Sequence, residues 1–254
     1  MLYFAIPVRD EAPTVGVLLW RLRAVFREYS RDYEVIVFDD GSQDDTRAVL
    51  EPYRKVLPLT IIGGREPVGY ARSLEALVRE VSGRTKYPRR DAMVVMQADF
   101  TDQPEHVPEL VKRFEGGADI VVVERQLDAS APTPVRRFRR FAPWALTPLR
   151  ALPEGIGDPF NAFRLYRIAV LRDVLKQIGD APLIRGDGWA ANVEMLVRAA
   201  EHARRIESIT VAPTYGIRPR PSRIRPIGDA LRMFQWARGA RALQTTRASG
   251  GATR

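Results

Sequence analysis

Short apolar runs alternate with helical patterns over the first 125 residues, and this alternation constrains the fold more than any other feature. The apolar runs are continuous, rich in Val and Ile, and lie at 2–6, 34–38, 59–62, 92–96 and 119–123. Such runs are typical of strands buried on both faces of a mostly parallel sheet. Helical patterns lie between them at 14–29, 45–55, 70–82 and 104–115, and Thr14 is the predicted N-cap of the first. The alternation predicts an α/β fold, an open sheet flanked by helices with its ligand beyond the carboxyl ends of the strands.

The pattern changes after residue 125. Residues 126–160 carry six prolines among arginines and aromatics, and we expect a long loop with short helical pieces. A strand near 162–167, helices at 168–178 and 189–203, and a strand at 206–211 are predicted to follow. From residue 226 the pattern predicts a basic amphipathic helix. We therefore divide the chain into one domain over residues 1–216 and a basic C-terminal extension over 217–254.

Composition excludes several classes of site. Cysteine is absent, so the chain has no disulfide, no thiolate nucleophile and no Cys-ligated metal. The two histidines, His106 and His202, are interpreted as surface residues of helices. No apolar run approaches the length of a membrane span. The first residues enter an apolar strand without a preceding basic region, which favours a cytoplasmic protein without a cleaved signal.

Positive charge is concentrated in two segments. The net charge is +9, and residues 129–153 hold five arginines and no acid. Residues 218–254 hold nine arginines and a single acid, Asp229. Since the basicity is local, it indicates surfaces that meet an anionic partner rather than a uniformly basic protein.

Carboxylates follow two of the predicted strands. Asp39 and Asp40 precede a Gly41-Ser42 turn, where they are placed to accept hydrogen bonds from a nucleobase or ribose. The alternative role is helix capping, for which Asp44 and Asp45 are also suited. Asp99 leaves the strand at 92–96 and is a candidate ligand for Mg²⁺ or Mn²⁺. Asp102 is interpreted as the cap of the helix that begins near Pro104.

Taken in order, these motifs resemble those of the family-2 glycosyltransferases, which have the GT-A fold, a Rossmann-type open sheet. The matching motifs are Pro7-x-Arg9-x-Glu11, Asp39-Asp40-Gly41-Ser42-x-Asp44-x-Thr46, Gly69-x-x-Arg72 and Gln97-Ala98-Asp99. Residues 158–167 and 192–196, with Arg218, Ser222 and Arg223, are similar to the polyprenyl-phosphate sugar transferases, the dolichol-phosphate mannosyltransferase group. The resemblance covers roughly residues 3–225.

The resemblance implies a pocket for a nucleotide sugar, GDP- or UDP-linked. Asp40 would read the base, Asp99 with Gln97 would hold Mg²⁺ or Mn²⁺ at the pyrophosphate, and Arg125 would meet the sugar or diphosphate. Arg218 and Arg223 would close over the phosphates. The other residues that the resemblance places on the nucleotide sugar are Pro7, Arg9, Glu11, Phe38, Ser42, Arg72 and Ala98.

On the acceptor side, the resemblance implies inverting transfer of a mannosyl or glucosyl group to a polyprenyl phosphate or another membrane-proximal acceptor. The implied acceptor-binding residues are Arg136, Arg137, Asp158, Arg164 and Ser222. A lipid phosphate is already anionic and needs no general base, whereas a hydroxyl acceptor would need one, with Asp187 and Glu194 as candidates. The arginine and aromatic segment at 136–141 favours an anionic membrane surface as partner, with the protein peripheral at the inner face of the membrane.

Departures from the family pattern keep other functions open. Gln97 stands where the family has its first metal-site Asp, which removes one negative charge and should weaken metal binding. Because of Gln97, a catalytically weakened or inactive sugar-nucleotide-binding homologue is one alternative. Asn161-Ala162 replaces the usual Ser-Gly, which leaves the identity of the acceptor open. A sugar nucleotidyltransferase is disfavoured because no glycine-rich loop follows the first strand. A nucleic-acid or anionic-surface binder is the third alternative, although the acidic strand ends disfavour nucleic acid.

Overall fold

The computed structural model describes residues 1–125, 133, 136–137, 152–153, 155–212, 228, 231 and 234–238. Its strands are β1 (Leu2–Val8), β2 (Tyr33–Asp40), β3 (Leu59–Gly64), β4 (Ala92–Val95), β5 (Ile120–Arg125), β6 (Arg164–Arg167) and β7 (Ile206–Val211). Its helices are α1 (Ala12–Glu28), α2 (Thr46–Leu50), α3 (Tyr70–Arg84), α4 (Val107–Glu115), α6 (Ile168–Ile178) and α7 (Trp189–Ala200). Single 3₁₀ turns cover Glu51–Lys55 and Pro104–His106.

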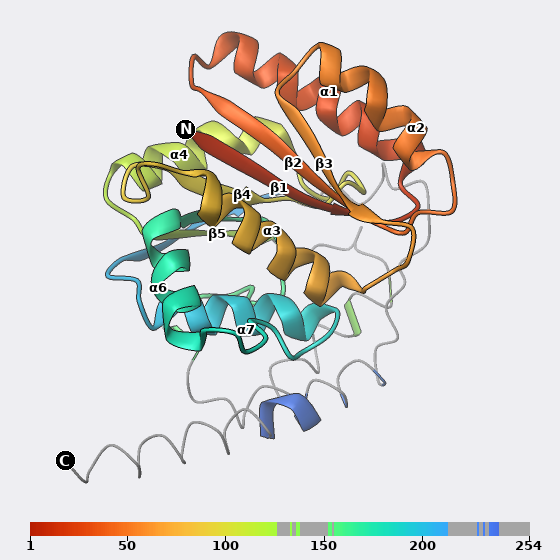
Figure 1. Ribbon diagram of the computed structural model, residues 1–254. Coiled ribbons are helices and arrows are strands. Elements are labelled where there is room, and N and C mark those ends of the chain that lie inside the picture. Colours follow the sequence, from red (N-terminus) through yellow and green to blue (C-terminus); the bar gives the residue numbers. More distant parts are fainter. Residues whose placement is uncertain are drawn as a thin grey trace, which may run out of the picture.

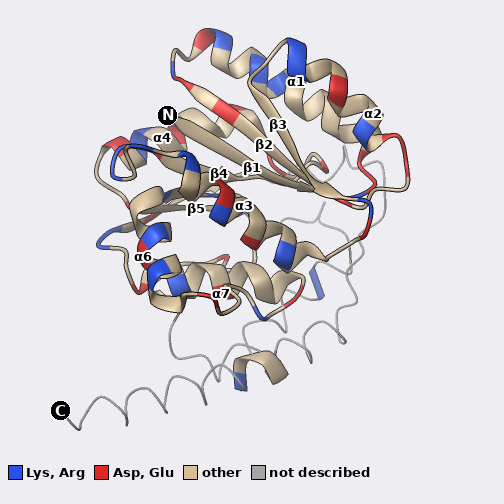
Figure 2. Cartoon of the chain, viewed as in Figure 1, with Lys and Arg blue, Asp and Glu red and all other residues tan. Residues whose placement is uncertain are grey.

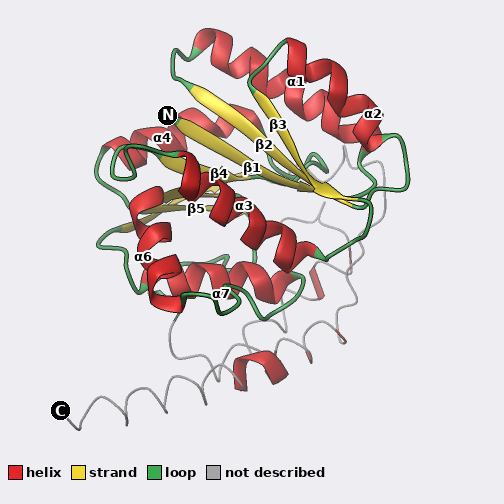
Figure 3. Cartoon of the chain, viewed as in Figure 1, coloured by secondary structure: helices red, strands yellow, loops and turns green. Residues whose placement is uncertain are grey.

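The strands form one sheet of seven in the order β3-β2-β1-β4-β6-β5-β7, with helices on both faces (Figures 1 and 3). β6 pairs antiparallel with β4 and β5, and the other pairs are parallel. The predicted open, mostly parallel α/β sheet is therefore confirmed.

Two apolar layers hold the helices to the sheet. On β1, Leu2, Phe4 and Ile6 face a core shared with α1, α2 and α4. Tyr3 and Ala5 face the opposite core, shared with α3, α6 and α7. This alternation follows from the two-residue period of a strand. Charged residues of both signs lie mainly on the outer surfaces of the helices, while the strands are mostly uncharged (Figure 2).

The strand order brings three polar loops to one edge of the sheet. β1 lies between β2 and β4 and pairs in parallel with both, with Val8 opposite Asp39 and Ala5 opposite Val95. The connections that leave these three strands therefore emerge side by side, at the point where the strand order reverses. In open α/β sheets this is where ligands bind.

Three sequence predictions about local structure need correction. Thr14 is not an N-cap: it is buried inside α1, and its hydroxyl donates to Glu11 O at 3.1 Å and to Glu11 Oε2 at 2.8 Å. The helix predicted at 45–55 divides after Leu50, since Pro52 is accommodated in the first turn of a new 3₁₀ segment rather than in a helix interior. The helix predicted at 104–115 likewise begins as the 3₁₀ turn at Pro104.

The C-terminal segment is described at a few positions. Gly228, Leu231 and residues 234–238 are helical, in agreement with the helix predicted from residue 226. The Arg238 guanidinium lies 5.9 Å from the centre of the Phe234 ring. Residues 213–227 lie outside the described part of the chain, so the predicted boundary near residue 216 falls there too. In the part of the chain that the structure describes, no helix has the length and apolar content needed to cross a membrane.

Candidate active site

The loops that follow β1 and β2 are tied to each other. Asp10 N donates to Ser42 Oγ at 3.0 Å, and Gln43 N donates back to Asp10 Oδ1 at 2.7 Å. Glu11 N donates to Thr46 Oγ1 at 2.8 Å. These bonds satisfy backbone donors that no strand or helix uses. They fix the loop that carries Arg9 and Glu11 against the loop that carries Ser42.

Asp39 and Asp40, the two adjacent acids at the end of β2, accept hydrogen bonds from backbone amides. Asp40 Oδ1 accepts from Val68 N at 2.6 Å and from Gly69 N at 3.0 Å, so it positions the start of α3. Asp39 Oδ1 accepts from Ser42 N at 3.1 Å. Both side chains are buried. Asp40, which the resemblance places on the base, therefore also organises the neighbouring loop.

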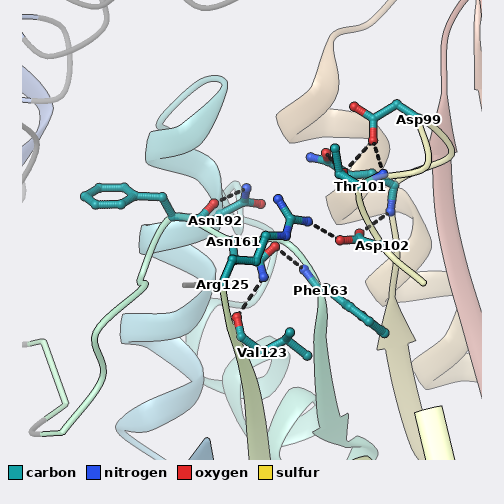
Figure 4. Close-up of polar contacts among 10 residues, drawn as sticks. Asp99, Thr101, Asp102, Val123, Arg125, Asn161, Phe163 and Asn192 are labelled. Atoms are coloured by element: carbon teal, nitrogen blue, oxygen red, sulfur yellow. Dashed lines mark hydrogen bonds and ion pairs between the residues drawn. The ribbon is translucent and has the colours of Figure 1, made fainter. Parts of the chain in front are cut away.

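The turn after β4 presents Asp99. Its Oδ1 accepts from Thr101 N at 3.2 Å and from Thr101 Oγ1 at 2.5 Å (Figure 4). Phe100, between them, has a φ of 65°, a left-handed conformation that is uncommon for an aromatic residue. Strain of this kind clusters at functional sites. The turn sets the direction of the Asp99 carboxylate at the switch-point edge.

Asp102 links this turn to β5. Its side chain is wholly buried, Oδ2 accepts from Gln97 N at 2.7 Å, and Oδ1 pairs with Arg125 Nη2 (Figure 4). Burial raises the pKa of Asp102, and Arg125 opposes that rise. Asp102 therefore does not cap the helix near Pro104: the N-cap residue there is Gln103, without a side-chain capping bond.

The residues present fit a divalent cation that is shared with a substrate phosphate. Asp99 offers a carboxylate and Gln97 an amide oxygen, both hard donors, while Asp102 is engaged by Arg125. Among the described residues there is no cluster of three or more His, Cys, Asp or Glu side chains suited to a metal. One or two carboxylates completed by phosphate oxygens are the usual setting of Mg²⁺.

Residues 158–164 form a buried polar network with α7. Asn161 Nδ2 donates to Val123 O at 2.7 Å, and Asn192 Nδ2 donates to Phe160 O at 3.0 Å. The Arg164 guanidinium donates to Asn192 O at 2.6 Å and to Pro159 O. Since Arg164 is 1% exposed, its predicted contact with an acceptor is corrected: it binds backbone carbonyls and shapes the turn that carries Asp158.

A groove of about 700 Å³ lies beside the start of α3 and is closed on its other side by residues of the segment 180–187. Arg72 lies on the α3 wall, and Arg185 and Asp187 lie on the opposite wall. All three side chains are exposed. Tyr70 connects this region to the polar network, because its hydroxyl donates to Asn192 Oδ1 at 2.7 Å. Burial raises the pKa of Tyr70.

Glu194, the second candidate base, is fully engaged. Its Oε2 accepts from Arg185 N and Gly186 N, each at 2.8 Å, and its Oε1 accepts from Arg198. Asp187 instead accepts from Gly188 N at 2.7 Å on Oδ1 and is exposed. The geometry therefore favours Asp187 over Glu194 wherever a base is needed.

Other predicted site residues are less central. Phe38 is corrected: its ring is packed in the core on the α3 face of the sheet. Pro7 and Ser42 are half-buried, Arg9 is exposed and Ala98 is buried. Arg136 and Arg137 are helical and exposed. Arg218, Ser222 and Arg223 lie outside the described residues.

Tyr70, Asn192 and Trp236 make hydrogen bonds around the candidate site, to Asn192, Phe160 and Glu194 respectively, and sequence reasoning does not single them out. Each acts through a hydrogen bond to a residue more than 30 positions away. Asn192 falls within the quoted 192–196 motif, which is the one signal that could have identified it. Tyr70 occupies an unspecified position of the Gly69-x-x-Arg72 motif, and Trp236 lies in none of the quoted motifs.

A family model, "Glycosyl transferase family 2", matches residues 3–175. The chain is similar to the undecaprenyl-phosphate mannosyltransferase of Micrococcus luteus, with 29% identity over 217 residues that cover 81% of this chain and 80% of that protein. It is also similar to the undecaprenyl-phosphate 4-deoxy-4-formamido-L-arabinose transferase of Serratia proteamaculans, with 29% identity over 177 residues. That match covers 67% of this chain and 50% of the relative, so the chain spans half of that longer protein.

Solved structures agree on the fold. Glucosyl-3-phosphoglycerate synthase from Mycobacterium tuberculosis, in complex with Mn²⁺, UDP and phosphoglyceric acid, superimposes with a TM-score of 0.64 at 18% identity. The match covers 96% of this chain and 78% of that one. S. aureus TarS 1–349 in complex with UDP gives a TM-score of 0.57 at 15% identity, over 93% of this chain and 64% of that one. These likenesses confirm the expected GT-A-like fold.

Proposed function

The chain belongs to glycosyl transferase family 2, and on this premise we propose that it transfers a hexosyl group of mannosyl or glucosyl type from a nucleotide sugar to a polyprenyl phosphate. The names of the Micrococcus and Serratia relatives, both undecaprenyl-phosphate transferases, support a lipid-phosphate acceptor. The relative with the longer match is a mannosyltransferase, which supports a mannosyl donor over the alternatives.

The observation that carries the phosphate acceptor is the engagement of Glu194. Both of its carboxylate oxygens accept hydrogen bonds from within the protein, so it is not available to remove a proton from a hydroxyl. A phosphate monoester is anionic at neutral pH and attacks without a base. Of the two candidate bases this leaves Asp187, which is exposed at the groove wall, and a phosphate nucleophile needs neither.

On the donor side, the switch-point edge supplies the binding groups. We assign the base and ribose to the tied loops that carry Glu11 and Ser42, beside Asp40. Asp99 is proposed to hold Mg²⁺ or Mn²⁺ together with the diphosphate, and Gln97 to complete the site with its amide oxygen. When bound, the cation neutralises charge that develops on the departing diphosphate. Arg125, oriented by Asp102, is assigned to the same diphosphate.

The transfer we propose is a single in-line displacement. A phosphate oxygen of the acceptor forms a bond to the anomeric carbon while the bond from that carbon to the diphosphate oxygen breaks, and the nucleoside diphosphate leaves with the electron pair. One displacement inverts the anomeric configuration. The protein contributes alignment and charge stabilisation rather than covalent chemistry.

We further propose that the protein works at an anionic membrane surface without spanning it. The acceptors named for its relatives are membrane lipids. Arg136 and Arg137 are exposed on a helical stretch, where arginine side chains can meet lipid phosphates.

Calorimetric titration tests the donor half of this proposal. GDP-mannose, UDP-glucose and their free nucleotides are each titrated with and without Mn²⁺. Metal-dependent binding of one donor is the expected result, and it identifies the nucleotide. Metal-independent binding would instead favour the weakened or inactive homologue that Gln97 suggests. No binding of any nucleotide would refute the proposed function.

Product analysis tests the acceptor half. The donor that binds is incubated with a short-chain polyprenyl phosphate, and the anomeric configuration of the glycolipid is read by NMR. An inverted product is expected, whereas a retained configuration would contradict the single displacement.

A further inference from the structure

Glu194 receives hydrogen bonds from three separate parts of the chain. Its Oε2 accepts from the backbone N–H groups of Arg185 and Gly186, each at 2.8 Å, and from the indole Nε1 of Trp236 at 3.1 Å. Its Oε1 accepts from Nε and Nη2 of Arg198, at 3.1 and 2.8 Å. The residue is only 6% exposed. Glu194 is therefore a buried junction between α7, the segment before it and the C-terminal tail.

The two backbone amides belong to a wall of the groove. Arg185, Gly186 and Asp187 line it opposite Arg72. Gly186 packs closely on α7, since a Cβ at this position would lie 2.9 Å from the Cβ of Ala190. Glu194 Oε2 accepts from two successive backbone amides, those of Arg185 and Gly186. The backbone conformation of this groove wall therefore depends on the position of the Glu194 carboxylate.

The third donor comes from a distant segment. Trp236 lies 42 residues after Glu194, in the helical stretch 234–238 that appears as a short blue helix beyond α7 in Figure 1. Ala237, next to it, is fully buried, and the Trp236 bond to Glu194 brings the stretch against α7. The Trp236 indole is a donor only, and it shares Oε2 with the groove amides. The tail thus reaches the same atom that sets the groove wall.

We propose that Trp236 is a positioning residue for the groove: by covering Glu194 and bonding to its Oε2, it couples docking of the C-terminal helix to the conformation of Arg185 and Gly186. The tail is in this view part of the working enzyme rather than an appendage. Only the kinetic consequence rests on the proposed glycosyl transfer, and the structural coupling does not. Coupling of this kind is reciprocal, so a ligand that orders the groove wall also stabilises the docked tail.

Amide hydrogen exchange on the full chain tests the coupling. Trp236→Ala opens the Glu194 carboxylate to water, which then competes for Oε2, and we expect exchange at Arg185 and Gly186 to accelerate about fivefold or more. Trp236→Phe keeps an aromatic ring but removes the N–H donor, and a smaller acceleration is expected. Gln235→Ala is the matched control, because Gln235 is exposed on the same helical stretch, and it should exchange as the wild type does.

Amides of β1, in the centre of the sheet, report whether a variant has kept its fold. If Trp236→Ala loses the fold, Trp236→Phe decides the question. Exchange at Arg185 and Gly186 that matches the Gln235→Ala control in the folded tryptophan variants would overturn the proposal. In transfer assays, Trp236→Phe is expected to raise KM more than it lowers kcat, because the variant changes a wall of the groove and no reacting group. Absence of transfer by the wild type would refute the proposed function but leave the exchange result intact.

Discussion

Arg125, the last residue of β5, forms an ion pair with Asp102, whose side chain is wholly buried in the turn after β4. The pair joins two strands that are not neighbours in the sheet, since β6 lies between them. Asp102 also accepts a hydrogen bond from Gln97 N at 2.7 Å. The arginine that we assign to the diphosphate is therefore held by the same turn that carries Asp99. One buried carboxylate thus organises both the turn that carries Asp99 and Arg125, the two groups that we assign to the diphosphate and its cation.

The raised pKa of Asp102 predicts a pH-dependent stability. Burial raises it against the lowering effect of Arg125, so the folded protein holds this proton more tightly than the unfolded chain does. The stabilisation from this proton is complete below the unfolded pKa of about 3.9 and is lost as pH rises through the folded value. Asp102→Asn does not titrate there. We expect the free energy of unfolding of the wild type, relative to Asp102→Asn, to fall as the pH rises above about 4.

Urea unfolding at a series of fixed pH values measures this difference. Asp45→Asn is the control, because Asp45 is exposed at the start of α2 and makes no side-chain capping bond. The control is expected to track the wild type across the range. A wild type that gains stability over Asp102→Asn as the pH rises would contradict the prediction.

Gln97→Asp is predicted to strengthen metal binding. The substitution adds a carboxylate beside Asp99, and oxygen-ligand affinity for hard cations rises with ligand charge. We expect the Mn²⁺ affinity measured in the presence of the nucleotide to rise about tenfold. Gln97→Asn, which keeps the amide but shortens the side chain, should show no such gain. Asp99→Asn should abolish the metal-dependent part of nucleotide binding, and its retention would remove Asp99 from the proposed site.

Sequence reasoning predicts the sheet well because its strands are buried on both faces. The runs at 2–6 and 119–123 are apolar almost throughout. Such a run predicts a buried strand without any knowledge of the strands that pair with it. At Phe38 the alternation of the strand predicts the structure better than the family resemblance does. The resemblance places Phe38 on the nucleotide sugar, whereas the alternation predicts a core position. With a two-residue period Phe38 shares a face with Ile36, and both side chains lie in the core on the α3 side.

Two of the errors concern polar residues whose partners are distant in sequence. Asp102 has the local context of a helix cap, yet its partner Arg125 lies 23 residues away. Arg164 falls within a matched motif, but its burial against carbonyls of Pro159 and Asn192 depends on how α7 packs. Helix capping is a local property that sequence can indicate. A buried polar network is a tertiary property, and no spacing rule encodes it.

Arg164→Lys is predicted to destabilise the fold strongly. The guanidinium donates to two backbone carbonyls and lies 3.3 Å from the Tyr166 hydroxyl, whereas an ammonium group cannot span the same acceptors with planar geometry. Leaving a buried charge and a carbonyl poorly paired should cost about 2–4 kcal/mol of unfolding free energy. Urea unfolding measures it. Arg79→Lys, on an exposed residue of α3, is the control and should cost under about 1 kcal/mol; equal losses would contradict the buried clamp.

Two adjacent glycines at the end of β3 are predicted to respond oppositely to alanine. Gly63 has a φ of 103°, and a Cβ there would lie 2.2 Å from Asp39 O, so backbone must move. A Cβ at Gly64 would meet no atom within 4 Å. Gly63→Ala should therefore lose about 2 kcal/mol or more of unfolding free energy and displace Asp39, which lowers nucleotide affinity as well. Gly64→Ala should be neutral or gain a few tenths of a kcal/mol, about what reduced unfolded-state entropy supplies. Thermal unfolding measures the stability of both variants, and titration measures their nucleotide affinity. If Gly63→Ala binds nucleotide as tightly as Gly64→Ala does, Asp39 and its loop do not contribute to the donor site.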